Sequence, residues 1–167
     1  MSVTIRVAIK HDAERLHQLA KLALENQYDG TSLASETLPA RLIERVYTVE
    51  AFQQALESDH RQLLVAEKAS EIIGMCQYGI PLMDDCDCED LREIHALFLH
   101  PQKADTEVGF ALVTALENSI NADATVQRLS VFVNPILMAT VKFYAKLGFH
   151  HDAAEDIGDE WYMEKNL

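Results

Sequence analysis

The sequence has few basic residues, few cysteines and no long hydrophobic run, and each shortage excludes a class of protein. No apolar stretch in the 167 residues approaches the roughly 20 residues that a membrane-spanning helix requires. The first residues, MSVTIRVAIK, lack the basic and apolar blocks of a signal peptide. We therefore expect a cytoplasmic protein with no membrane partner.

Cysteine is limited to Cys76, Cys86 and Cys88, an odd number in a chain large enough to bury a core without crosslinks. This count predicts reduced thiols. The last two lie in the acidic segment LMDDCDCEDL, which raises the alternative of a metal site. Two thiolates are too few for zinc and no second pair follows at zinc spacing, so we predict no metal and interpret the segment as an acidic loop.

Basic residues number 14 against 27 acidic ones, which gives a net charge of −13. A surface of this sign repels a phosphate backbone, so nucleic acid is not an expected partner. Solubility alone accounts for the charge, and attraction of a cationic ligand such as an amine is the alternative. The length and the 49% apolar content are those of an ordinary globular protein, which predicts one domain over residues 1–167.

The spacing of apolar residues predicts an α/β protein with a mixed sheet. Alternation indicates a first strand over residues 3–9, and Asp12 is the predicted N-cap of a helix that follows. Thr48 is the predicted N-cap of a later helix, which runs to about residue 58. The other predictions are a turn-like segment at 26–37, a helix at 38–47, strands before and after a turn at 68–70, a strand at 92–100, a helix at 105–120, a strand at 126–133, a helix from Pro135 to about Lys146, and strands at 149–153 and 160–165.

Two stretches together resemble the GNAT superfamily of N-acetyltransferases. REIHALFLHPQKADTEVGFALVTAL is similar to the family's central strand, proline, pyrophosphate loop and following helix. LSVFVNPILMATVKFYAKLGFHH is similar to its later strand, asparagine, tyrosine-bearing helix and Leu-Gly-Phe. The resemblance implies a GNAT-like α/β fold with a mixed, mostly antiparallel central sheet flanked by helices. It also implies direct transfer of an acetyl group from acetyl-CoA, as co-substrate and without a metal, to a primary amine. The acceptor would be a small molecule, a polyamine or a peptide, and a homodimer is a further implication.

The pyrophosphate loop departs from the family pattern, which places Arg or Gln three residues after the proline and then two glycine positions. Ala104 stands at the first of these positions and Glu107 at the second, whereas Gly109 matches the third. Glu107 brings a negative charge towards two phosphates, which predicts weakened coenzyme binding. Alternatively, Asp105 and Glu107 only start the helix, and the amides remain usable with Lys103 adding positive charge.

The resemblance assigns catalytic roles to Tyr144, which would protonate the departing thiolate, and to Glu93 or His95, which would pass the proton of the amine to water. From the residues alone, Tyr144 could be a packed aromatic, and the other two could be surface groups. Alternation predicts that Glu93, His95 and Leu97 share one strand face. Asn134 would reach the pantetheine arm, or it caps the helix that begins at Pro135.

The resemblance also assigns coenzyme contacts to backbone groups and to the start of the helix after the loop. The cofactor-binding residues expected on this basis are Leu97, Phe98, Leu99, Lys103, Gly109, Phe110, Ala111 and Asn134. Asn134 and Tyr144 favour an active enzyme. Ala104 and Glu107 favour the alternative, a degenerate GNAT-fold domain without transferase activity that acts as a binding or regulatory module.

Overall fold

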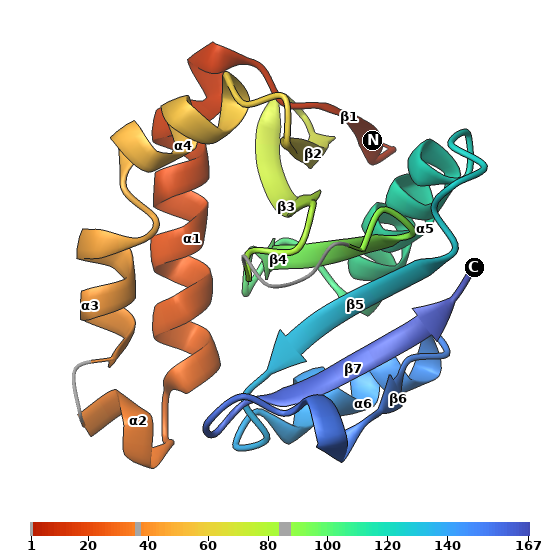
Figure 1. Ribbon diagram of the computed structural model, residues 1–167. Helices are drawn as coiled ribbons and strands as arrows, with labels where there is room; N and C mark the ends of the chain where they lie inside the picture. The colour runs from red at the N-terminus through yellow and green to blue at the C-terminus, as the bar shows by residue number, and fades with distance from the viewer. Residues whose placement is uncertain (1, 36–37, 84–87) are drawn as a thin grey trace.

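The computed structural model describes residues 2–35, 38–83 and 88–167 (Figure 1). Its centre is a seven-stranded sheet in the order β1-β2-β3-β4-β5-β7-β6. All neighbouring strands are antiparallel except β4 and β5, which are parallel. Helices α1 to α4 cover one face, and α5 and α6 cover the other (Figure 1). This arrangement confirms the α/β class with a mixed, mostly antiparallel sheet.

The elements follow one another in the predicted order. They are β1 (Thr4–Val7), η1 (Lys10–Asp12), α1 (Ala13–Tyr28), α2 (Ser32–Ser35), α3 (Leu38–Arg45), α4 (Val49–Leu56), β2 (Arg61–Lys68), β3 (Glu71–Gly79), β4 (Leu91–Leu99), α5 (Thr106–Ile120), β5 (Arg128–Val133), α6 (Met138–Lys146), β6 (His150–His151), η2 (Ala153–Glu155) and β7 (Trp161–Asn166).

Local chemistry fixes several of these boundaries. Thr48 caps α4 as predicted, because its Oγ1 accepts a hydrogen bond from the Ala51 N–H at 3.1 Å. The turn between β2 and β3 holds Ala69 at φ 53° and Ser70 at φ 66°, and two left-handed residues match the twist of a tight hairpin. The segment at 26–37, predicted as turn-like, instead contains the end of α1 and the short α2, since Tyr28 is buried in the core and extends the first helix.

Two apolar cores lie on opposite faces of the sheet. One joins the strands to α5 and α6 and includes Leu112, Leu116 and Leu129. The other joins them to α1, α3 and α4 and includes Leu16, Phe52 and Met75. A helix that contributes a stripe of such residues has to face the sheet, so the helical repeats read from the sequence determine the layering.

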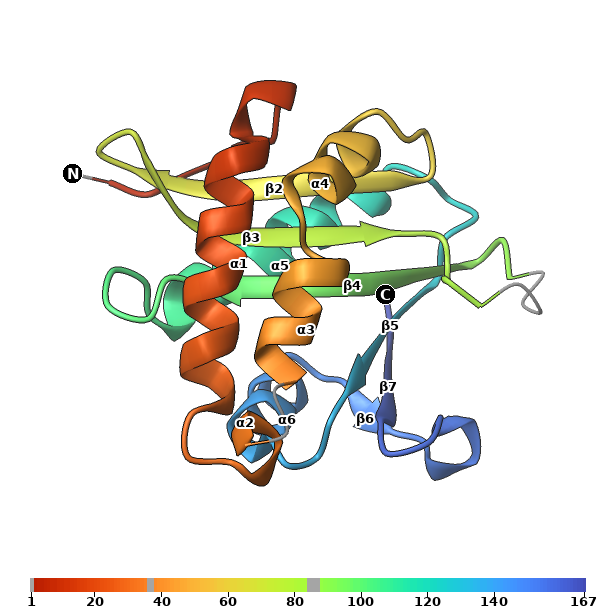
Figure 2. The ribbon, with the colours of Figure 1, turned by 90° about the vertical axis from the view of Figure 1, so that its left-hand side faces the viewer.

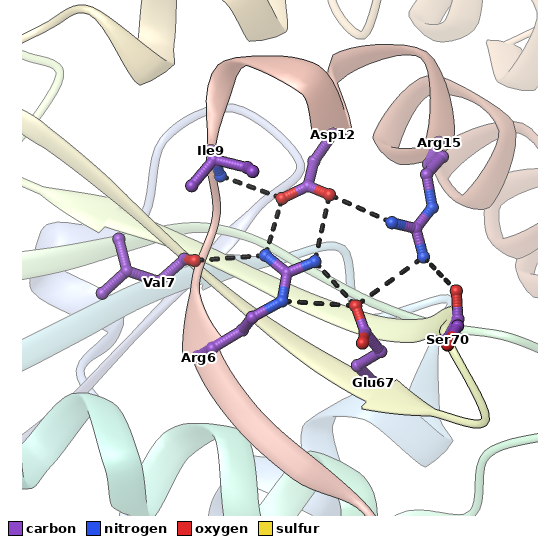
Figure 3. A network of polar contacts seen from close by, with 7 residues as sticks. All are labelled: Arg6, Val7, Ile9, Asp12, Arg15, Glu67 and Ser70. Atoms are coloured by element: carbon purple, nitrogen blue, oxygen red, sulfur yellow. Dashed lines mark hydrogen bonds and ion pairs between the residues drawn. The ribbon is translucent and has the colours of Figure 1, made fainter.

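Asp12 occupies the predicted N-cap position of α1, but its side chain is the centre of a buried ion-pair network (Figure 3). Its carboxylate accepts no capping hydrogen bond from the backbone N–H groups of α1. It accepts instead from Arg6 Nη1 at 2.7 Å, from the Ile9 N–H at 2.9 Å and from Arg15 Nη1 at 3.2 Å. Arg6 also donates to Glu67 on β2 at 2.7 Å. The network therefore ties β1, α1 and β2 together at one end of the sheet.

The predicted cysteine chemistry holds at one described position and fails at another. Cys76 is a free thiol on β3 with no exposed surface, and burial raises its pKa to about 12. Cys88 is disulfide-bonded, so the prediction of reduced thiols is wrong there. Cys86 and the rest of the acidic stretch at 84–87 lie outside the described residues. None of the described helices is long and apolar enough to cross a membrane.

Candidate active site

The site begins where β4 and β5 separate. Only Leu91–Ile94 of β4 pair with Arg128–Val131 of β5. Beyond Ile94 the two strands diverge, and β5 runs downward away from β4 (Figure 2). His100 donates its N–H to Ile73 on β3 at 2.8 Å, and the main-chain groups of successive strand residues point in opposite directions. The groups of Leu97 and Leu99 therefore point away from β3, towards the gap, whereas those of Phe98 point to β3.

A β-bulge in β4 sets the directions of the side chains around this gap. The register with β3 shifts between the pairs Gln77–Ala96 and Tyr78–Ile94, so His95 is the extra residue. After the bulge, Phe98 packs in the core beside α1 and Leu97 packs against the core beside α5. The prediction that Leu97 continues the face of Glu93 and His95 is therefore wrong, because an extra residue reverses the alternation.

Two cavities open on this gap. The first, the central cavity, has a volume of about 370 Å³ and lies between β4, β5, α1 and α3. The second, the α1–α6 cavity, has a volume of about 570 Å³ and lies between those two helices and the end of β4. The residues that line both are Gln27, Leu97, Phe98, Leu137, Thr140 and Tyr144. Two compartments that share a wall can hold two reactants at one junction.

Glu93 and His95 lie together in the wall of the central cavity. The Glu93 Oε1 and His95 Nε2 atoms are 3.8 Å apart, and their side chains are only 7% and 3% exposed. His95 Nε2 lies 2.9 Å from the carbonyl oxygen of Ile80, so it carries the proton that this acceptor requires. His95 Nδ1 is buried and has no partner among the described residues. Burial lowers the pKa of His95 and raises that of Glu93, which favours the neutral form of each.

Tyr144 lies on α6 and is part of the wall that both cavities share. Its side chain is buried, and its ring contacts those of Phe143 and Phe149 edge-on. Burial raises the pKa of Tyr144 well above its usual value, so the phenol keeps its proton. Tyr144 therefore packs among aromatic rings and also lies where the two cavities meet.

Asn134 lines the central cavity at the end of β5. Its Oδ1 accepts from the Ile136 N–H at 3.0 Å, and its carbonyl oxygen accepts from the Leu137 N–H at 2.9 Å. These bonds close a turn, and α6 begins only at Met138, three residues later than predicted. The side-chain amide of Asn134 keeps its N–H groups as donors, because the turn uses only oxygen atoms.

The loop before α5 satisfies much of its own backbone. Lys103 and Ala104 both donate their N–H groups to the carbonyl oxygen of His100. Asp105 caps α5, because its Oδ1 accepts from the Val108 N–H at 3.3 Å. Glu107 is exposed in the first turn. The N–H groups of Thr106 and Glu107 have no hydrogen-bond partner in the described parts of the chain, as is usual at a helix start.

The other residues expected to bind the coenzyme surround this helix start and line neither cavity. Lys103 forms an ion pair with Glu71 at 2.6 Å. A β-carbon added to Gly109 would lie 2.8 Å from Cε2 of Phe143, so a larger residue there would require Phe143 to shift. Phe110 stacks on Phe143 with ring centroids 5.1 Å apart, and Ala111 is exposed. Phe143 lines the α1–α6 cavity, so it connects the helix start to that cavity.

Several site features have no clear signal in the sequence. Glu160 lines the central cavity from the start of the last hairpin, where it pairs with Ile157. Gln27 and Thr140 contribute polar groups from α1 and α6, and Gln27 Nε2 donates a hydrogen bond to Thr140 Oγ1 at 3.4 Å. Glu160 follows a polar Gly-Asp turn and reads as an ordinary surface acid, so only the tertiary structure reveals its position.

Comparison with known proteins identifies the family. Over residues 13–161 the sequence matches the model of the acetyltransferase (GNAT) domain family. A search of curated proteins finds no significant match. Several solved structures share the fold. The PaiA N-acetyltransferase of Thermoplasma acidophilum, in complex with coenzyme A, has a TM-score of 0.87 and 22% identity over 100% of both chains.

Two further structures are similar at comparable identity. A ribosomal-protein-alanine N-acetyltransferase of Brucella melitensis gives a TM-score of 0.75 and 21% identity over 98% of this chain and 99% of that one. An N-acetyltransferase of Staphylococcus aureus Mu50 gives 0.73 and 15%, over 99% of each chain. The structural likeness shows the shared fold and the family match covers most of the sequence, so this chain belongs to the GNAT family of acetyltransferases and is an acyltransferase.

Proposed function

We propose that the protein transfers the acetyl group of acetyl-CoA directly to a primary amine. The observation that carries this proposal is the junction of two cavities at Tyr144, in the gap between β4 and β5. The α1–α6 cavity takes the pantetheine arm of the coenzyme and the central cavity takes the amine. The similar structure from T. acidophilum, which contains coenzyme A, supports the binding of this coenzyme by the fold.

The donor thioester binds along the open edge of β4. The main-chain groups of Leu97 and Leu99 point into the gap, where a backbone N–H can stabilise negative charge that develops on the acetyl oxygen. Phe98 contributes its side chain to the walls of both cavities. Asn134, in the wall of the central cavity, donates from its side-chain amide to the end of the pantetheine arm that reaches the junction of the two cavities. The amides at the start of α5, with Gly109, Phe110 and Ala111 behind them, bind the diphosphate, and Lys103 leaves Glu71 to join it.

The acceptor arrives as an ammonium ion and has to lose a proton before its nitrogen can attack. His95 Nδ1 accepts that proton, because the ring is neutral and this nitrogen is unpaired among the described residues. Glu93 Oε1 lies 3.8 Å from His95 Nε2, so an oxygen atom of the Glu93 carboxyl group lies beside the imidazolium that forms.

The amine nitrogen then bonds to the carbonyl carbon, and the carbon–sulfur bond breaks. Tyr144 gives its proton to the thiolate, and the second proton of the attacking nitrogen returns to the Tyr144 oxygen. The products are an acetamide, free coenzyme A and one proton released by His95.

Replacing Tyr144 with phenylalanine tests this assignment. Y144F should lower kcat by about 100-fold, the usual contribution of a positioned acid, and leave the Kd of acetyl-CoA within about twofold. Steady-state kinetics with a panel of amines and calorimetric titration with acetyl-CoA give the two values. Y78F is the matched control, because Tyr78 is also buried but bonds to Gln62 and Ser119 away from both cavities.

The wild-type protein should bind acetyl-CoA with a Kd below about 1 mM. An unchanged kcat in Y144F would reject the acid role. Absence of both acetyl-CoA binding and transfer would favour the alternative that the fold serves as a binding module.

A further inference from the structure

A short turn lies between the central cavity and a neighbouring outer cavity. Residues 157–160, called the 157–160 turn below, come directly before β7, and Ile157 and Glu160 at its two ends line the central cavity. Ile157 also lines the outer cavity, which has a volume of about 650 Å³ and shares Glu93 with the central one. The position of this turn therefore determines how far the two cavities are separated.

The 157–160 turn has little support of its own. Ile157 donates its N–H to the carbonyl oxygen of Glu160 at 3.1 Å, and Glu160 donates its N–H to the carbonyl oxygen of Ile157 at 3.0 Å. This pair lies outside the strands of the sheet, and Gly158 turns the chain at φ 58°. Two extended segments joined by a tight turn are at best marginally stable in water, so other contacts have to hold this one in place.

His151 on β6 makes contacts at both ends of the turn. Its Nε2 lies 3.0 Å from both side-chain oxygen atoms of Asp156, the residue before the turn, and it carries the proton because a carboxylate only accepts. Its ring stacks on Trp161, the residue after the turn, with ring centroids 4.1 Å apart and planes 11° apart. Asp156 Oδ1 also accepts from the Tyr162 N–H at 2.8 Å. One side chain therefore fixes the chain where it enters the turn and where it leaves it.

The sheet and its core hold His151 itself. His151 is opposite Met163 in the register of β6 with β7, and Met163 is buried in the core beside α5 and α6. Trp161 packs against the same core. The contacts of His151 therefore connect the exposed 157–160 turn to a fixed part of the molecule.

We propose that His151 is a positioning residue that limits the size of the acceptor amine, because it holds the 157–160 turn in the wall of the central cavity. The inference rests on the proposed function and adds a residue that determines specificity in that reaction. In the described part of the chain, His151 contributes to the lining of neither cavity, so it acts through Ile157 and Glu160. Without it the turn leaves the wall, and the central and outer cavities join.

Replacing His151 with alanine tests this role by kinetics. H151A should raise the KM of butylamine about fivefold and leave kcat within about twofold, because Tyr144 and His95 keep their places. The ratio of kcat/KM for benzylamine to that for butylamine should rise about threefold or more, since the bulkier amine uses the added space.

Two further variants separate this role from a general effect on the strand. H150A is the matched control, because His150 is exposed and its side chain points to the opposite face of the same strand. It should change neither the KM of butylamine nor the ratio of the two amines. H151Q keeps a donor for Asp156 without the stacked ring, so it should restore part of the KM lost in H151A.

Hydrogen exchange gives a readout that needs no turnover. The N–H groups of Ile157 and Glu160 should exchange about tenfold faster in H151A than in the wild-type protein or in H150A. Trp161 is the single tryptophan of the chain, so fluorescence emission reports on its contact with His151 and should change in H151A but not in H150A.

Faster exchange in H151A together with a higher benzylamine-to-butylamine ratio would support the inference. Unchanged exchange, or faster exchange with an unchanged ratio, would overturn it and leave acetyl transfer intact. Absence of transfer to any amine in the wild-type protein would reject the proposed function and the size limit with it, whereas the exchange rates would still decide whether His151 holds the turn.

Discussion

At the scale of single residues, Glu107 is the departure from the family loop whose effect is easiest to measure. It is exposed in the first turn of α5, where Asp105 already caps the helix. Removing its charge without removing its side chain should tighten acetyl-CoA binding, because the diphosphate then meets one negative charge fewer. For E107Q we expect a Kd about threefold lower, a size typical of exposed charge pairs.

The control for this prediction is E50Q, which removes an acid from the first turn of α4. The two variants lose the same charge, so only a local effect separates them. Calorimetry at two salt concentrations measures the difference, which should shrink as screening increases. A Kd for E107Q that is equal to or higher than that of wild type would contradict the proposed repulsion.

Residue type and motif position predicted more of the candidate site than the alternation along the strand did. Motif positions indicate Asn134 and Tyr144, and acid–base chemistry on the strand REIHALFLH indicates Glu93 and His95. All four residues line the central cavity. Glu160 belongs to no such motif. Its position in the wall of the central cavity depends on contacts between segments that lie far apart in the sequence.

At the scale of elements, Gly109 sets how closely α5 approaches α6. A β-carbon there would lie 2.8 Å from Phe143 Cε2 and 3.3 Å from Leu99 Cδ1. G109A should lower the free energy of unfolding by about 1–2 kcal/mol, since overpacking outweighs the gain in helix propensity. Thermal denaturation should show a Tm about 3–6 °C lower.

T114A separates packing from propensity, because Thr114 is exposed on the same helix and its replacement should raise the Tm slightly. Adding F143L to G109A should restore part of the lost stability, since the smaller side chain leaves room for the new methyl group. A G109A protein as stable as wild type would show that Phe143 moves aside without cost.

Helices and strands were largely predictable, and their ends less so. The helix predicted at 105–120 is α5, Thr106–Ile120, because its apolar repeat faces the sheet without interruption. The bulge at His95 was not predictable, since the sequence REIHALFLH contains no signal that marks one residue as extra. The late start of α6 likewise depends on how the Asn134 turn uses its oxygen atoms.

At the scale of the whole molecule, the order of elements and the family resemblance predicted the fold, and the family match confirms it. The divergence of β4 and β5 could not be read from the order of elements. It depends on where the parallel pairing stops, and no residue marks that point in the sequence. The Asp12 network was also missed, because an aspartate before a helix has the composition of a cap whether it faces the helix or the core.

The Asp12 network should make the stability of the fold depend on pH. Burial raises the pKa of Asp12, but the hydrogen bonds from Arg6 and Ile9 and the charges of Arg6 and Arg15 outweigh it and hold the pKa below its usual value. A depressed folded-state pKa stabilises the fold above the unfolded-state pKa, about 3.9, and the contribution is lost as the pH falls through the folded-state value. D12N should therefore be about 2 kcal/mol less stable than wild type at pH 7, with the difference shrinking below about pH 4. Urea denaturation across this range measures it, with the exposed D29N as control, and a difference that does not change with pH would show that the Asp12 charge plays no part.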